Sequence, residues 1–158
     1  MIIRNASATD LDAIITLSAF VARQHADALP DLFKAPSEPE QTKDAFRDFL
    51  ADSTSLMLVA EETQPVGYLW AQFRNRPDGW ARRGQRLLYI QHMAVAPQFR
   101  RRGVGRLMLA RAVDIARQEG IKRVELDVWS FNSDAKRFYT KHGFEVFNEK
   151  MAFRTDMA

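Results

Sequence analysis

The sequence predicts one domain of the α/β class, with a mixed, largely antiparallel central sheet flanked by helices. Two observations lead to this prediction. Apolar residues recur with a period of two in some segments and of about 3.6 in others, and strands and helices alternate in the second half of the chain. The expected order is β-α-α-β-β-β-α-β-α-β. With 158 residues, 46% apolar and 27% charged, residues 1–158 should form a single domain with a buried core.

The first half should contain a strand, two helices and a hairpin. Residues 9–12 are typical of a helix N-terminus, because Thr9 or Asp10 can accept hydrogen bonds from the first turn. Prolines after this helix interrupt it before the next one begins. The expected elements are a strand at 2–5, a helix opening at 9–12, a helix at 40–50 and two strands at 56–61 and 66–73, joined by the turn at 62–65.

The second half should be βαβ-like, after a long loop at 75–84. Gly120 and Gly143 follow periodic apolar segments and are typical C-terminal capping residues. The expected elements are a strand at 86–95, a basic loop at 96–102, a helix at 103–119, a strand at 124–129, a helix at 133–142 and a last strand at 144–153.

The most informative stretch is the basic loop before the helix at 103–119. It reads Arg100-Arg101-Arg102-Gly103-Val104-Gly105. A helix start has unpaired backbone N–H groups and the positive end of the helix dipole, so it can bind an anion. Glycine lets a ligand approach the backbone closely, and arginine adds positive charge. This loop therefore predicts a phosphate or pyrophosphate site.

Composition narrows the function classes. The chain has no cysteine, which excludes disulfides, iron–sulfur clusters and a thiol nucleophile, and its histidines lack the spacing of a metal site. No apolar run approaches the ~20 residues of a membrane helix, so we expect a soluble, unprocessed, cytoplasmic protein without a membrane partner. The net charge is +3. The arginines could contact nucleic acid, but no known nucleic-acid-binding motif accompanies them, so that partner is not expected.

Two motifs in the second half resemble those of the GNAT superfamily of N-acetyltransferases. The first, Arg100-x-x-Gly103-x-Gly105 after a strand, is similar to the R/Q-x-x-G-x-G/A pattern of that family's acyl-CoA site. The second begins at Leu126-Asp127-Val128 and continues with Asn132, Ala135, Tyr139 and Gly143-Phe144 at the family's spacing. The resemblance is clear over residues 87–144. It implies a GNAT-like sheet in which strands four and five splay apart around acyl-CoA.

The resemblance also implies acetyl-CoA as the cofactor. The backbone of strand four would pair with the pantetheine amides as if the cofactor were an additional strand. The basic loop would hold the pyrophosphate through its backbone, with charge-assisted contacts from its arginines. The cofactor-binding residues expected on this basis are Met93, Ala94, Val95, Arg100, Arg101, Arg102, Gly103, Val104, Gly105, Arg106, Asn132, Lys136 and Tyr139.

The candidate catalytic residues are one tyrosine and two carboxylates. In family terms, Tyr139 lies beside the thioester sulfur, where its O–H could protonate the departing thiolate. Asp127 is the candidate base, because the family often has an acidic residue at this place, and Glu125 shares its face of the strand. Either carboxylate could accept the amine proton through a water. Both could equally be ordinary exposed strand residues.

Strand four departs from the pattern of many relatives, which carry Glu or His there. Period-two alternation places Tyr89, Gln91 and Met93 on the face where that base would lie. None of the three is a good base at neutral pH. The same alternation points His92 to the other face, as a packed core histidine.

The acceptor is expected to be a primary amine that enters over the first two helices and the loop between strands three and four. The basic stretch from Arg74 to Arg86 argues for an acceptor with a carboxylate or phosphate, and aromatic side chains could frame its amine. The expected lining residues are Leu29, Phe33, Trp80, Tyr89, Gln91 and Trp129.

The function expected from these observations is direct transfer of an acetyl group from acetyl-CoA to the amine of a small molecule, peptide or protein. Strand-four backbone N–H groups would hold the oxyanion, and no acyl-enzyme would form. The alternative is a catalytically silent acyl-CoA-binding or regulatory module, because strand four lacks an obvious base. A nucleic-acid-binding protein is a third class. The resemblance also implies a homodimer, since relatives of this kind are often dimers.

Overall fold

The computed structural model describes residues 1–36 and 39–155. The chain divides into two compact units, Met1–Asp127 and Val128–Ala158. The first unit contains the whole sheet and three of the helices, and the second contains one helix and the C-terminal segment.

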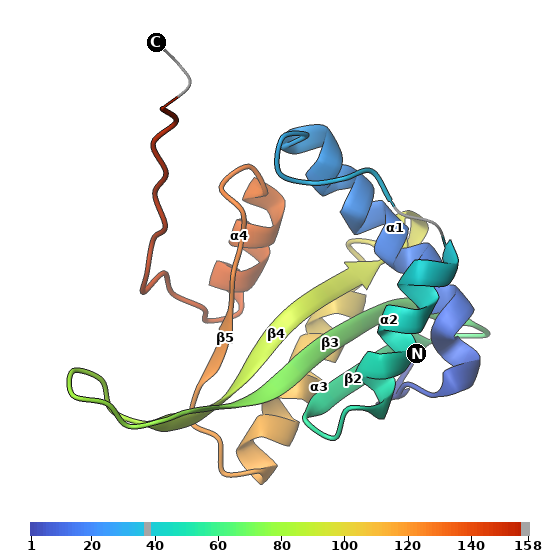
Figure 1. Cartoon of the computed structure of the whole chain (residues 1–158). Coiled ribbons are helices and arrows are strands. Elements are labelled where there is room, and N and C mark those ends of the chain that lie inside the picture. The colour runs from blue at the N-terminus through green and yellow to red at the C-terminus, as the bar shows by residue number, and fades with distance from the viewer. Residues whose placement is uncertain (37–38, 156–158) are drawn as a thin grey trace. The chain divides into compact units, whose positions relative to one another are not determined.

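The first unit is built on a five-stranded sheet with the order β1-β2-β3-β4-β5 (Figure 1). Neighbours are antiparallel from β1 to β4, and β5 runs parallel to β4. The predicted mixed, largely antiparallel sheet flanked by helices is therefore confirmed. The strands are β1 (Ile2–Asn5), β2 (Ser55–Glu61), β3 (Pro65–Arg76), β4 (Gln85–Val95) and β5 (Val124–Leu126).

Helices cover both faces of this sheet (Figure 1). The helices of the unit are α1 (Leu11–Ala28), α2 (Pro39–Ala51) and α3 (Val104–Gln118). Ile14 of α1 and Phe46 of α2 are buried in one cluster with Tyr68 of β3. α3 packs on the opposite face, where Met108 and Val104 approach Gly67 of β3. The core therefore lies in two layers, one on each side of β3.

Gly67 sets how closely α3 approaches the sheet. A Cβ atom at this position would come within 3.0 Å of the carbonyl oxygen of Ala94 and 3.1 Å of the Cε atom of Met108. Such distances are shorter than normal van der Waals contact, so the absence of a side chain allows the close packing. This contact holds the first turn of α3 near the C-terminal end of β4.

Strand β5 is shorter than the sequence predicts. The expected strand at 124–129 is wrong beyond Leu126, since only Val124–Leu126 pairs with β4. Strand β3 is longer than expected and reaches Arg76. The β3–β4 hairpin therefore projects as a long ribbon with its loop at 77–84 (Figure 1).

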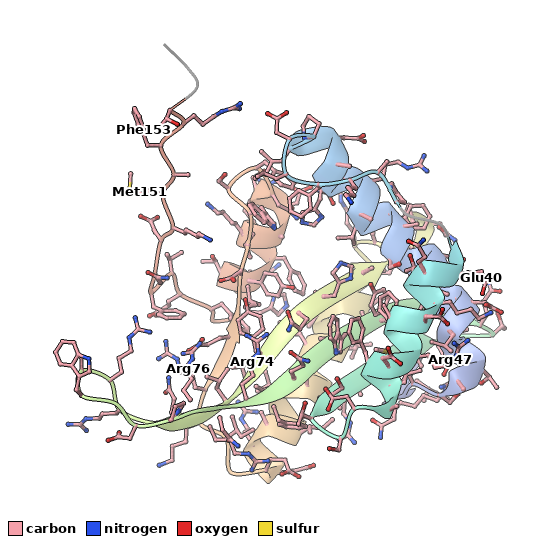
Figure 2. All side chains as sticks on the ribbon, in the orientation of Figure 1. Glu40, Arg47, Arg74, Arg76, Met151 and Phe153 are labelled. Carbon is pink, nitrogen blue, oxygen red and sulfur yellow. The ribbon has the colours of Figure 1, made fainter. Side chains whose placement is uncertain are left out.

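The second unit contains α4 (Ser133–Lys141), followed by an extended segment. The predicted strand at 144–153 is wrong, because no described residue of that segment is in a strand. Its apolar residues are typical of a strand, but a strand also needs a neighbour for its N–H and C=O groups, and periodicity does not supply one. Met151 and Phe153 are almost fully exposed on this segment (Figure 2). In the described part of the chain, no helix is both long and apolar enough to cross a bilayer.

An ion pair ties the start of α1 to the first strand. Arg4 of β1 donates two hydrogen bonds of 2.8 Å to the carboxylate of Asp10, which also accepts the backbone N–H of Ser7 over 2.7 Å. Asp10 is buried. The hydrogen bonds from Arg4 lower the pKa of Asp10 to about 2, against an opposing effect of burial.

We predict that Asp10→Asn lowers the free energy of unfolding by about 2 kcal/mol at neutral pH, since the pKa of this carboxyl is near 3.9 in an unfolded chain. A carboxyl whose pKa is depressed in the folded state stabilises it fully above the unfolded pKa and loses this effect as pH falls toward the folded pKa. The difference between wild type and variant in urea unfolding should therefore shrink between about pH 4 and pH 2. A difference that is constant with pH would contradict a charged Asp10.

Candidate functional site

A β-bulge in β4 decides which side chains and backbone groups reach the site. Trp70 of β3 lies opposite His92, whereas Ala71 lies opposite Ile90, so Gln91 is an extra residue without a partner in β3. One inserted residue reverses the alternation of side chains beyond it. His92 therefore lies on the same face as Tyr89, and Met93 lies on the other face. The predicted faces of His92 and Met93 are both wrong for this reason.

His92 is nevertheless half-buried and packs against the ring of the buried Tyr68. The Tyr68 hydroxyl and the Nδ1 atom of His92 form a short hydrogen bond. Burial, with a smaller effect of the His25 charge, lowers the pKa of His92 to about 4. The imidazole is therefore neutral at physiological pH and held by a buried tyrosine.

The C-terminal half of β4 has an open edge in the described part of the chain, because β5 pairs only with Leu88–Ile90. The N–H of Ala96 donates to Val66 over 2.9 Å, which shows that even-numbered amides here face β3. By alternation, the backbone groups of Met93 and Val95 face away from β3. The Nε atom of Arg100 donates to the carbonyl oxygen of Val95 over 3.1 Å.

The loop after β4 presents a row of free backbone N–H groups. Arg101 and Gly103 both have positive φ angles, of 61° and 83°. The first N–H of α3 with a backbone acceptor belongs to Leu107, which donates to Gly103 over 3.1 Å. Among the described residues, no acceptor faces the N–H groups from Arg101 to Arg106. Consecutive free N–H groups at a helix N-terminus form an anion site.

The arginines of this loop differ in how they are held. Arg102 lies over the ring of Phe99, with its Cζ atom 5.0 Å from the ring centroid. Its Nη2 atom lies 3.9 Å from the Oε1 atom of Glu62. Arg101 is exposed. The sequence prediction of a basic, glycine-containing loop between β4 and α3 is thus confirmed.

A second group of polar residues lies on the sheet face that carries Tyr89. Tyr89 donates its O–H to Asp127 over 2.5 Å, and the guanidinium of Arg74 lies 3.8 Å above its ring. The amide of Gln91 donates to Gln72 over 2.6 Å. Burial raises the pKa of Tyr89 to about 12, and the hydrogen bond to Asp127 adds to this effect. We call these five residues, Gln72, Arg74, Tyr89, Gln91 and Asp127, the polar cluster.

Glu125 is placed differently from Asp127. Its carboxylate is buried and accepts two hydrogen bonds from Arg76, of 3.0 and 2.6 Å, and one of 2.5 Å from Arg123. Burial raises its pKa, but the hydrogen bonds from the two arginines outweigh it, so the net pKa is below the usual range. A carboxylate bound in this way is a poor proton acceptor, because protonation would break these bonds.

The second unit carries the other predicted residues, all on or next to α4. Asn132 caps this helix, since its Oδ1 atom accepts the N–H of Ala135 over 3.1 Å. At the C-terminus, Phe144 N–H donates to Tyr139 O and Gly143 N–H to Thr140 O, both over 3.1 Å. With Gly143 at φ 87° this is a Schellman motif. The rings of Tyr139 and Phe144 lie 5.5 Å apart. Burial raises the pKa of Tyr139 to about 12, so its hydroxyl is a donor at neutral pH.

The remaining predicted residues are Phe33, Trp80, Trp129 and Lys136. Phe33 packs on His25, with ring centroids 4.9 Å apart. Trp80 is fully exposed in the hairpin loop and packs against none of the described residues. Trp129 belongs to the second unit, as does Lys136, which is exposed.

Sequence reasoning missed Gln72, and it treated Arg74 and Arg76 only as part of a basic stretch that favours an acceptor with a carboxylate or phosphate, without naming them as site residues. A signal was present, because these polar residues follow Tyr68 and Trp70 at every second position of β3. That alternation assigns them all to one face. Figure 2 shows both arginines along the end of β3 that leads to the hairpin loop.

The sequence and fold are similar to those of known acetyltransferases. The acetyltransferase (GNAT) family matches residues 22–144. Streptothricin acetyltransferase of Streptomyces lavendulae is 30% identical over 94 residues, which are 60% of this chain and 46% of that protein. The chain thus spans less than half the length of this curated relative.

Two solved structures share the fold. The BH1408 protein of Bacillus halodurans superimposes with a TM-score of 0.90 at 24% identity, covering 98% of this chain and 99% of that one. The aminoglycoside N-acetyltransferase AAC(6')-Iy, solved in complex with CoA, superimposes with a TM-score of 0.77 at 17% identity, covering 98% and 94%.

We predict that Arg76→Met lowers the free energy of unfolding by about 1–3 kcal/mol, because it removes two hydrogen bonds from a buried carboxylate. Arg86→Met is the matched control. Arg86 lies on the same hairpin, but its partner Glu119 is half-exposed, so its loss should cost below about 1 kcal/mol. Urea unfolding measures both values. Equal losses would mean that Glu125 does not depend on Arg76.

Proposed function

This chain belongs to the GNAT family of acetyltransferases, and we propose that it is an N-acetyltransferase that moves an acetyl group from acetyl-CoA directly to a primary amine. The observation that carries the proposal is the row of free N–H groups from Arg101 to Arg106, next to the open edge of β4. We also propose that residues 1–158 act together as one acyltransferase domain in the cytoplasm, and that the protein forms homodimers.

The residues present fit acetyl-CoA at two chemically different points. The loop N–H groups are donors without acceptors, which suits a pyrophosphate. The outward backbone groups of Met93 and Val95 supply donors and acceptors in strand geometry, which suits the pantetheine amides. Arg100 already reaches the carbonyl of Val95, so it lies where these two parts of the site meet. Asn132 and Lys136 are assigned to the cofactor by the family resemblance.

When bound, acetyl-CoA supplies the thioester that reacts with the amine. Asp127 would accept a proton from the ammonium form of the acceptor, directly or through a water. We prefer it to Glu125, whose carboxylate is held by two arginines. Tyr139 would donate its hydroxyl proton to the sulfur that leaves. Holding the reactants in line can lower the barrier by about 7–11 kcal/mol, so a weak base suffices.

We predict that Gly103→Val weakens acetyl-CoA binding at least about tenfold. The added side chain would stand in front of the loop N–H groups, where the nearest atom to its Cβ is Nη2 of Arg106 at 3.9 Å. Gly120→Val is the matched control, since Gly120 also has a positive φ of 68° but ends α3 instead of beginning it. Both variants carry comparable backbone strain.

Calorimetric titration with acetyl-CoA, CoA, ATP and NADH tests this assignment. Wild type and Gly120→Val should bind the CoA compounds at micromolar concentration and neither of the others, whereas Gly103→Val should not. Tight binding by Gly103→Val would refute the loop assignment. An absence of CoA binding by wild type would overturn the proposed function.

We predict that Tyr139→Phe lowers the rate of thiol release from acetyl-CoA, with a panel of primary amines, by about 100-fold. A general acid contributes about 10²–10⁴-fold to a reaction, and phenylalanine keeps the ring contact with Phe144. Acetyl-CoA affinity should be nearly unchanged, because only a hydroxyl is removed. Equal rates for both proteins would exclude Tyr139 as the acid. A wild type that binds acetyl-CoA and releases no thiol with any amine would be the silent binding module.

A further inference from the structure

The polar cluster holds two opposite charges that do not pair with each other. Arg74 lies over the face of the Tyr89 ring, and Asp127 accepts the hydroxyl hydrogen of the same tyrosine. All three belong to the first unit of the chain. Among the described residues, neither Arg74 nor Asp127 forms an ion pair, although both contact the side chain of Tyr89.

Arg76, on the same face, has the carboxylate partner that Arg74 lacks. It lies two residues beyond Arg74 on β3 and forms a bidentate ion pair with the buried carboxylate of Glu125. Arg74 instead has one long hydrogen bond, of 3.3 Å, to the side-chain oxygen of Gln72. A guanidinium has five N–H donors, and stacking on a ring leaves its edge available. That edge matches a carboxylate, which it binds through two parallel hydrogen bonds.

The neighbouring side chains hold this arrangement in place. The amide of Gln91 donates to the same oxygen of Gln72 that accepts from Arg74, so three side chains form one connected group. Arg74 is half-buried, which strengthens its attraction for an anion compared with an arginine in open solvent. The site therefore offers a cation over the ring of Tyr89 and an anion at its hydroxyl.

We propose that the acceptor is a free amino acid, whose carboxylate binds Arg74 and whose amino group lies at Asp127. This inference rests on the proposed function, because the amine at Asp127 is the group that becomes acetylated. The two charged groups of an amino acid are a few bonds apart and opposite in sign to the residues that face them. An amine without a carboxylate would leave Arg74 unmatched.

In the proposed acetyl transfer, every bond formed is matched by a bond broken, and every proton released has an acceptor. The ammonium of the amino acid gives one proton to Asp127 and becomes a neutral amine. Its nitrogen forms the new C–N bond to the acetyl carbon while the C–S bond breaks, and the electron pair of that bond leaves with the sulfur. The nitrogen loses a second proton and the sulfur gains one. The products are the N-acetyl amino acid, the CoA thiol and the proton that Asp127 returns to solvent.

Matched pairs of acceptors test the inference. We would measure thiol release from acetyl-CoA with each of the common L-amino acids and with the corresponding amino acid amides, which keep the amine and lack the carboxylate. At least one amino acid should exceed its amide by about 10–100-fold in kcat/KM, the range expected for hydrogen bonds to a charged group. The difference should lie mainly in KM.

Variants of two arginines assign the effect. Arg74→Met should remove the preference by lowering kcat/KM for the amino acid and leaving the amide unchanged, and Arg74→Lys should keep part of it. Arg86→Met is the control, because Arg86 lies opposite Asn75 on the other face of the hairpin. As a second readout, the preferred amino acid should raise the unfolding temperature of the CoA-loaded wild type but not of CoA-loaded Arg74→Met.

The possible outcomes separate this inference from the proposed function. The inference would be overturned if the amino acid amides reacted as well as the amino acids, or if Arg74→Met lost activity equally with both. Neither result would contradict the proposed acetyltransferase activity. Thiol release confined to amines without a carboxylate, such as polyamines, would have the same meaning. A wild type that does not bind acetyl-CoA would overturn both.

Discussion

The β-bulge at Gln91 is the constraint on which both parts of the candidate site depend. Upstream of it, the amides of Leu88 and Ile90 pair with β5, and the side chain of Tyr89 contacts Arg74 and Asp127 of the polar cluster. Downstream, the inserted residue turns the amides of Met93 and Val95 outward, at the level where β5 has ended. In a regular strand those amides would be bonded to β3. The open edge exists because the bulge and the short β5 coincide.

The arginines next to the sheet differ in the groups that they contact. Arg4, Arg76 and Arg123 are held by carboxylates, and the Asp10 and Glu125 carboxylates that they hold are both buried. Of these pairs, Arg76 with Glu125 joins segments that are far apart in the chain, β3 and β5. Arg74 is chemically identical to Arg76 and lies on the same face, yet it stacks on an aromatic ring. The difference lies in the partner, because Arg76 pairs with the carboxylate of Glu125 and Arg74 lies over the ring of Tyr89.

Glycine conformations supply the third element of the arrangement. Gly103 and Gly143 both have positive φ angles, and each lies at a helix end that the proposed chemistry uses. At Gly103 the helix begins without a side-chain cap, which leaves its N–H groups available to a ligand. At Gly143 the Schellman motif brings Phe144 back onto the ring of Tyr139. Positive φ angles at glycine thus leave the N–H groups at the start of α3 without acceptors, and allow the carbonyl groups at the end of α4 to accept hydrogen bonds.

Local features of the sequence determined most of the elements and the basic, glycine-containing loop before α3. Hydrophobic periodicity and glycine positions predicted the four antiparallel strands, all four helices and the loop from Arg100 to Gly105, because these depend on residues close together in the chain. The tertiary structure decided the faces of His92 and Met93, the end of β5 at Leu126 and the absence of a strand at 144–153. It also decided which arginines are paired. Each of these depends on a partner strand or side chain that is distant in sequence. The hydrophobic periodicity of a single segment shows neither a bulge nor the absence of a neighbouring strand.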